Sequence, residues 1–148
     1  MKKIIFLILL GFIAFQSIDA QRKTFAMGLR IEGNDPNNLG ASIRYRIHKP
    51  TILEGIVHFY DGFIGASLLY ERYKNLSSSG TFDFFYGGGV HLAFGNDVGA
   101  GVAGILGFCY TFKDIPVNIS LDWKPVLDII DNTNFRASLF GISIRYTF

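Results

Sequence analysis

The sequence predicts an all-β protein, an eight-stranded antiparallel transmembrane up-and-down β-barrel that follows a cleaved signal peptide. Beyond the first twenty residues, apolar and polar residues alternate with a period of two, and no stretch keeps the 3.6-residue apolar period of a helix. The stretch 141–148 has one purely apolar face and one face that carries a charge, and it ends on Phe148. Such a strand suits a barrel whose outer surface contacts lipid.

Residues 1–20 have the features of a secretory signal peptide. Lys2 and Lys3 precede an apolar run over 4–15, and Ala20 is a small residue at the expected cleavage site. The apolar run is shorter than the roughly 20 residues that a helix needs to cross a bilayer. We therefore expect a signal peptide over 1–20 and a single domain over 21–148. The full chain has a formal charge of +2, and the domain has +1 because Lys2, Lys3 and Asp19 are removed with the signal peptide.

Eight strands are expected in the domain, each bounded by residues that favour turns. The strands are 24–32, 39–48, 52–60, 63–73, 81–94, 98–112, 117–128 and 135–148. Glycine, proline, asparagine, aspartate or serine recur in the segments between them, at 33–38, 49–51, 61–62, 74–80, 95–97, 113–116 and 129–134. The strands are long enough to cross a bilayer at a tilt, for which about 9–11 residues suffice.

One face of these strands is apolar in every case, with Arg72, at a strand end, as the only charged residue on it. In chain order it carries Phe25, Met27, Leu29 and Ile31; Leu39, Ala41, Ile43, Tyr45 and Ile47; Leu53, Gly55, Val57 and Phe59; Ile64, Ala66, Leu68 and Tyr70; Phe82, Phe84, Tyr86, Val90, Leu92 and Phe94; Val98, Ala100, Val102, Leu106, Phe108, Tyr110 and Phe112; Val117, Ile119, Leu121, Trp123 and Leu127; and Ile142, Ile144, Tyr146 and Phe148. The charged residues occupy the other face: Arg30, Glu32, Arg44, Arg46, His48, Glu54, His58, Glu71, Asp83, His91, Asp122, Lys124 and Arg145.

Alternation alone fits two kinds of barrel. A soluble lipocalin-like barrel turns its apolar face inward, whereas a membrane barrel turns it outward. The nearly unbroken apolar face, the terminal aromatic strand and the position of aromatic residues near both ends of the strands favour the membrane barrel. Tyr60 and Tyr73 are counted among these aromatic belts.

The chain resembles the small eight-stranded Gram-negative outer-membrane barrels, the outer-membrane protein β-barrel domain family that includes OmpX, Ail and the transmembrane half of OmpA. The resemblance is carried by the segments 86–91 and 112–125 and by the terminal strand, in which Gly141, Ile144, Tyr146 and Phe148 match an assembly signal. It implies an outer-membrane location with both termini in the periplasm, contact with outer-membrane lipid and lipopolysaccharide, and recognition by the barrel-assembly machinery and periplasmic chaperones. The expected outer loops are short, which weakens an adhesin function.

The lumen of an eight-stranded barrel is only wide enough for its own side chains, so we expect a polar plug. Its charges balance, with five basic and five acidic residues. A turn over 49–51 would place Arg46 opposite Glu54 as an ion pair. The expected charge network comprises Arg30, Arg44, Arg46, Glu54, Glu71, Asp83, Asp122, Lys124 and Arg145, together with Glu32.

Sequence motifs for chemistry are weak. Cys109 is the only cysteine, and His48, His58 and His91 lie on separate strands without metal-ligand spacing. A lipid A deacylase would place a serine two residues after a histidine, and none of the three histidines has one. We expect no catalytic residues, no cofactor, no metal and no nucleic-acid partner.

The expected role is therefore that of an outer-membrane protein with a plugged lumen, structural or surface-interacting and without catalysis. The alternative is a narrow pore for ions or small solutes, motivated by a wholly polar lumen and by small inward residues on the fifth and sixth strands. A lipid A-modifying enzyme is a third hypothesis.

Overall fold

The computed structural model describes residues 24–33, 38–60, 62–95, 98–130, 134–137 and 139–148. The predicted signal peptide lies outside these residues. Among them, no helix is long and apolar enough to cross a membrane. The regular elements are β1 (Phe25–Glu32), β2 (Leu39–His48), β3 (Thr51–Tyr60), β4 (Phe63–Asn75), β5 (Phe82–Phe94), β6 (Val98–Thr111), β7 (Val117–Trp123), β8 (Val126–Ile130), β9 (Asn134–Arg136) and β10 (Phe140–Thr147).

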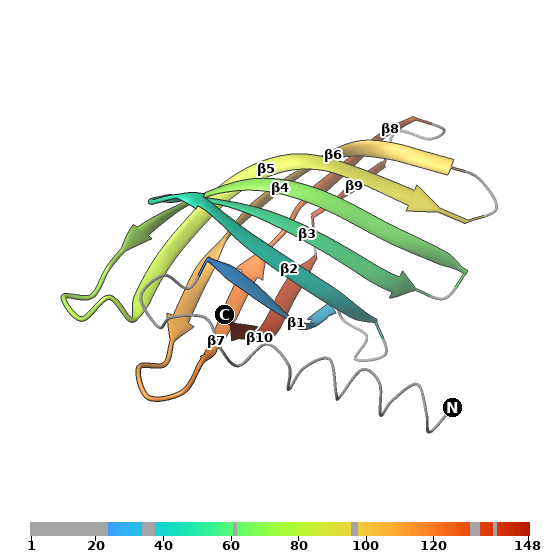
Figure 1. Cartoon of the computed structure of the whole chain (residues 1–148). Coiled ribbons are helices and arrows are strands. Elements are labelled where there is room, and N and C mark those ends of the chain that lie inside the picture. Colours follow the sequence, from blue (N-terminus) through green and yellow to red (C-terminus); the bar gives the residue numbers. More distant parts are fainter. Residues whose placement is uncertain (1–23, 34–37, 61, 96–97, 131–133, 138) are drawn as a thin grey trace, which may run out of the picture.

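These strands close into one antiparallel barrel (Figure 1). Each of β1 to β6 pairs with the next along the chain, and β10 pairs with β1 and β7. The strands β7 and β8 follow each other along β6, and β9 pairs with β8. Both pairs, β7 with β8 and β9 with β10, are thus single barrel strands with an interruption, and the described strands occupy eight positions in the wall. The predicted eight-stranded antiparallel barrel is confirmed.

The interruption of the seventh strand occurs at Lys124 and Pro125. Proline has no N–H to donate to the ladder and is usually found where strand pairing is broken. The main chain still makes bonds there: Lys124 N donates to Leu139 O at 2.8 Å, and Gly104 N donates to Pro125 O at 2.9 Å. The wall therefore remains joined through the break.

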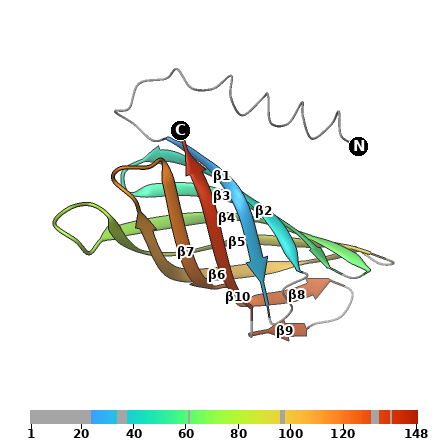
Figure 2. The ribbon, with the colours of Figure 1, turned by 90° about the horizontal axis from the view of Figure 1, so that it is seen from below.

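The two ends of the barrel differ in what they carry. We call the end that holds Thr24 and Phe148 the terminal end; Thr24 N donates to Phe148 O there at 3.1 Å. The opposite end holds the ends of β3 and β5. Figure 2 shows β1 and β10 side by side along the wall.

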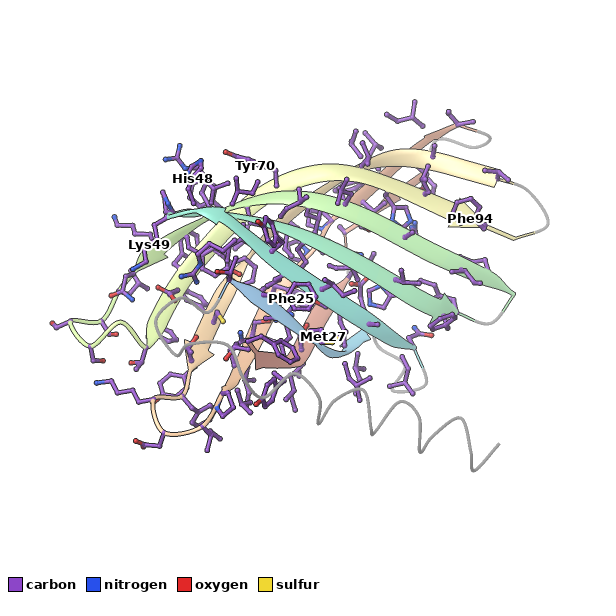
Figure 3. The ribbon with its side chains drawn as sticks, viewed as in Figure 1. Phe25, Met27, His48, Lys49, Tyr70 and Phe94 are labelled. Carbon is purple, nitrogen blue, oxygen red and sulfur yellow. The ribbon has the colours of Figure 1, made fainter. Side chains whose placement is uncertain are left out.

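The outer surface of the barrel is apolar and the interior is charged. Leu29 is 69% exposed and Ile144 54%, whereas their neighbours Arg30 and Arg145 are buried. Figure 3 places Tyr70 near one end of the barrel and Phe94 near the other, and both are exposed. Tyr60 and Tyr73 do not belong to the aromatic belts as predicted, because their hydroxyls donate to Glu32 and Glu71 inside the barrel.

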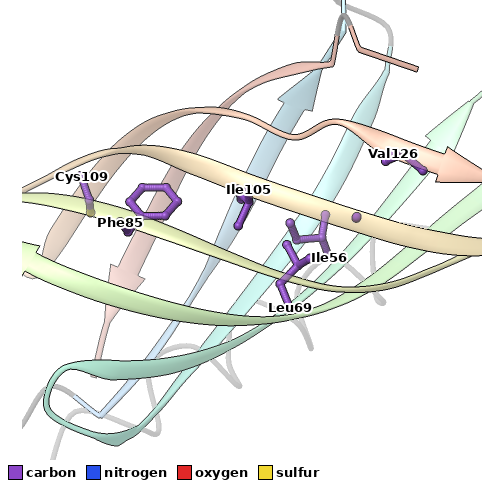
Figure 4. Close-up of a cluster of buried hydrophobic side chains, with 7 residues drawn as sticks. Ile56, Leu69, Phe85, Ile105, Cys109 and Val126 are labelled. Atoms are coloured by element: carbon purple, nitrogen blue, oxygen red, sulfur yellow. The ribbon is translucent and has the colours of Figure 1, made fainter. Parts of the chain in front are cut away.

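The lumen is not wholly polar, which corrects the sequence prediction. A cluster of buried apolar side chains lines the wall formed by β3 to β6 and β8 (Figure 4): Ile56, Leu69, Phe85, Ala103, Ile105, Cys109 and Val126. Tyr73 stacks on Phe85 with ring centroids 5.1 Å apart. The interior thus has an apolar side and a charged side.

Candidate functional site

The half of the lumen towards the opposite end holds a compact ionic cluster, which we call the opposite-half network: Arg30, Glu32, Asp122 and Lys124. Arg30 donates to both carboxylate oxygens of Asp122, at 2.6 and 2.5 Å, and its Nε donates to Glu32 Oε2 at 2.9 Å. Lys124 Nζ lies 2.9 Å from Glu32 Oε1. All four side chains are fully or almost fully buried, so each charge depends on its partners.

The strand register explains how Arg30 reaches two acids. Glu32 on β1 and Asp122 on β7 both pair with Gly141 on β10. A Cβ built on Gly141 would meet the guanidinium of Arg30. The glycine therefore provides the space in which Arg30 lies between two carboxylates.

A second cluster, the terminal-half network, comprises Arg44, Glu54, Glu71 and Arg145. Glu54 lies 2.9 Å from Arg44 and 2.6 Å from Arg145, and it accepts a hydrogen bond from Ser42 Oγ at 2.5 Å. Arg145 also donates to Ser120 Oγ at 2.7 Å. The network therefore joins strands on opposite sides of the lumen.

Arg44 connects the terminal-half network to the apolar cluster. Its guanidinium carbon lies 4.8 Å from the ring centroid of Phe85 and 5.5 Å from that of Tyr73, within the range of cation–π attraction. Arg44 Nη2 lies 3.8 Å from Glu71 Oε2. Charged and apolar side chains thus meet at the middle of the lumen.

The predicted ion pair between Arg46 and Glu54 is wrong. Glu54 is the cross-strand partner of Arg44, and Arg46 pairs in register with Ile52. The cause is an irregularity between Arg46 and His48, where the register shifts before the turn. Among the described residues, neither Arg46 nor Asp83 forms an ion pair; Asp83 accepts a hydrogen bond from Asn75 at 2.8 Å.

A large cavity opens at the terminal end, with a volume of about 1170 Å³. We call it the terminal-end cavity. Its lining includes Ala26, Arg44, Arg46, Cys109, Asn118 and Thr147. Because Arg44 belongs to both the lining and the terminal-half network, the cavity extends into the lumen as far as that network.

The barrel is similar to a solved structure described as a de novo designed transmembrane β-barrel. The TM-score is 0.61 at 11% sequence identity, over 88% of this chain and 100% of the other. At this identity the likeness shows the fold alone. No protein-family model matches the chain, and no curated protein matches it.

One group of polar residues escaped sequence analysis. Ser67 and His91 are direct cross-strand partners, and Ser67 Oγ lies 2.9 Å from His91 Nδ1. Arg136 Nη2 lies 3.1 Å from His91 Nε2 and 3.0 Å from Asp128. A search for serine and histidine on one strand misses a pair that two strands bring together.

The hydrogen bonds of His91 show what this group can do. A guanidinium has donors only, so Arg136 donates to Nε2 of His91 and the ring proton resides on Nδ1. Nδ1 then donates to Ser67 Oγ, towards which Lys124 Nζ also points at 3.4 Å. In this arrangement His91 cannot take a proton from Ser67, which a nucleophilic serine requires.

The residues of the predicted assembly signal lie on or directly after β10. Ile144 is exposed on the outer surface, whereas Gly141 faces Arg30 in the lumen. The ring of Phe148 contacts Phe25 at 5.7 Å and Tyr146 at 4.8 Å between centroids. Recognition of this strand by an assembly machinery stays a prediction.

Metal binding has no obvious location in the part of the chain that the structure describes. No group of three or more histidine, cysteine, aspartate or glutamate side chains there could hold a metal ion. Cys109 is a buried free thiol that belongs to the apolar cluster.

Proposed function

We propose that this protein is an integral outer-membrane β-barrel with a lumen closed by its own side chains, and that it has a structural or surface-interaction role without catalysis. The observation that carries the proposal is the reversed distribution of polarity: fully buried ion pairs lie in the interior, while large apolar side chains cover the exterior. In water such an exterior would be unfavourable, whereas lipid makes it the stable arrangement. The designed transmembrane barrel supports the same environment.

The closed lumen rests on the two charge networks. Each contains two basic and two acidic residues, so the formal charges of each network balance. Arg30 and Arg145 reach across to acids on other strands and occupy the space that a permeating solute would need. Opening the lumen would break several buried ion pairs at once, which is unfavourable.

The location and partners follow from the same proposal. We place both termini in the periplasm, with the outer surface in contact with outer-membrane lipid and lipopolysaccharide. The strand β10 would be recognised by the barrel-assembly machinery and periplasmic chaperones. Its support is the alternation along β10, where Ile142 and Ile144 are exposed and Ser143 and Arg145 are buried.

A lipid A-modifying activity is the least supported of the three candidate functions. Its support would be the Ser67–His91 pair, but the proton arrangement set by Arg136 is the reverse of the one that activates a serine. The pair also lies inside the lumen, where both residues are buried, rather than on the lipid-facing surface.

A narrow pore is the second candidate, and the terminal-end cavity favours it because this cavity already opens part of the lumen. Single-channel conductance of the refolded protein in a planar bilayer separates the two. The folded state is checked first by faster migration in an unboiled gel. A closed lumen predicts no discrete current steps from verified barrels, whereas reproducible steps would refute it and make the protein a small channel.

A further inference from the structure

Two residues that line the terminal-end cavity carry buried polar atoms that the charge networks leave unused. Asn118 and Thr147 line it, and each residue is only 7% exposed. Neither Asn118 Oδ1 nor Thr147 Oγ1 has a hydrogen-bond partner among the described residues. Buried polar groups in native proteins are almost always paired, so two of them on one cavity indicate a site that awaits a polar partner.

The same cavity has an uncompensated positive charge. The register shift that pairs Arg44 with Glu54 leaves Arg46 without an acidic partner in the described part of the chain, and Arg46 lines the cavity. Lys49 also lines the cavity, and Asp83, which accepts a hydrogen bond from Asn75, is the acidic residue in the lining, so Arg46 and Lys49 leave one positive charge in excess. The cavity is therefore suited to an anion.

These groups form a continuous arc across the wall. Arg44 on β2 pairs with Ala26 on β1, which pairs with Thr147 on β10. Asn118 on β7 lies on the other side of β10. Because Ala26 has a small side chain, it leaves space between the arginines on one side and Thr147 and Asn118 on the other.

We propose that the terminal-end cavity binds a small oxyanion that carries its own hydroxyl donor: hydrogen phosphate, or a phosphate monoester whose organic part has a hydroxyl group. Arg46 would pair with the oxyanion, since a guanidinium matches phosphate with two parallel hydrogen bonds. The Thr147 hydroxyl would donate to a phosphate oxygen, and Asn118 Oδ1 would accept from the O–H of hydrogen phosphate or from a hydroxyl of the monoester. The volume of about 1170 Å³ leaves room for the organic part of a monoester.

Sulfate is the natural comparison ligand. It has a similar shape and charge but no hydroxyl at neutral pH, so it would leave Asn118 Oδ1 without a partner. This site goes beyond the proposed function and is independent of whether the lumen conducts, because the cavity is open at one end of the barrel.

The test is titration calorimetry of the refolded protein in an uncharged maltoside detergent at pH 7. Inorganic phosphate, glycerol 3-phosphate and sulfate are compared, so that free phosphate and a monoester are distinguished. We expect saturable binding of at least one phosphate ligand and weaker binding of sulfate. Arg46→Gln should weaken phosphate binding about tenfold, as the loss of a charge-assisted hydrogen bond does. Arg72→Gln is the matched control, since Arg72 is an exposed arginine on β4 outside the cavity lining.

Thr147→Val separates a binding role from a structural one. It keeps the side-chain shape and removes an unpaired hydroxyl, so it should weaken phosphate binding while the denaturation midpoint stays unchanged or rises. A lowered midpoint with unchanged binding would overturn the assignment of Thr147. Absence of binding by both phosphate ligands, sulfate binding as tight as phosphate, or equal effects of Arg46→Gln and Arg72→Gln would overturn the site.

Discussion

The substitution Glu54→Gln gives the sharpest test of the terminal-half network. Glu54 is fully buried, lies 2.9 Å from Arg44 and 2.6 Å from Arg145, and accepts from Ser42. Glutamine keeps the shape but removes the charge, so two buried guanidinium groups lose their shared counter-ion. Removing one partner of a buried ion pair destabilises a protein by about 3–5 kcal/mol. At roughly 2 kcal/mol per molar urea, the unfolding midpoint should fall by about 2 M.

The assay is urea unfolding of the refolded barrel in lipid vesicles, followed by the fluorescence of Trp123 and by the gel shift of the folded form. The control is Arg46→Gln, because Arg46 forms no ion pair in the described residues. The free energy of unfolding of this variant should differ from that of the unmodified protein by less than about 0.5 kcal/mol. The double variant Glu54→Gln with Arg145→Gln should recover part of the loss, since it removes an unpaired charge. A midpoint for Glu54→Gln within the error of the unmodified protein would refute the view that this network holds the lumen together.

Two further predictions concern the wall. Leu29→Arg places a charge in the middle of the outer surface, where Leu29 is 69% exposed, and in a lipid bilayer it should cost about 2–4 kcal/mol of unfolding free energy. The matched change Val98→Arg at the opposite end should cost about 0–1 kcal/mol, because a charge costs less near the bilayer surface than at its middle. Equal, negligible effects at both positions would argue for a barrel in water. Gly141→Ala forces a methyl group against the Arg30 guanidinium and should destabilise the barrel by about 1–3 kcal/mol, measured by the same unfolding assay. Gly55→Ala is the control, since a Cβ there has no neighbour within 4 Å; a Gly141 variant as stable as the Gly55 variant would show that Arg30 moves without cost.

The strands and their two faces could be predicted because both are local properties. Successive side chains in a strand point to opposite faces, so alternation in the sequence maps directly onto outside and inside. Ile142 and Ile144 are exposed and Ser143 and Arg145 are buried, as the alternation along 141–148 indicates. The predicted strand boundaries were also close to the observed ones, although the break at Pro125 divides one expected strand into β7 and β8.

The contacts inside the lumen could not be predicted because they depend on register and closure. A shift near one turn moved Glu54 from Arg46 to Arg44. Ser67 and His91 meet only because β4 pairs with β5 in one particular register. The apolar side of the lumen was missed because β5 and β6 carry apolar residues on both faces, as at Phe85 and Ile105, which hides the alternation.

By itself, the sequence determined an all-β chain of eight amphipathic strands with charges on one face, because hydrophobic periodicity depends only on the order of residues along each strand. Only the tertiary structure decided which charges pair, which polar atoms remain free and where a cavity opens. These depend on closing β1 against β10 and β5 against β6, which brings residues that are far apart in the chain to within hydrogen-bond distance, as in Arg30 and Asp122. Asn118 and Thr147 line the cavity because closure places β7, β10 and β1 side by side.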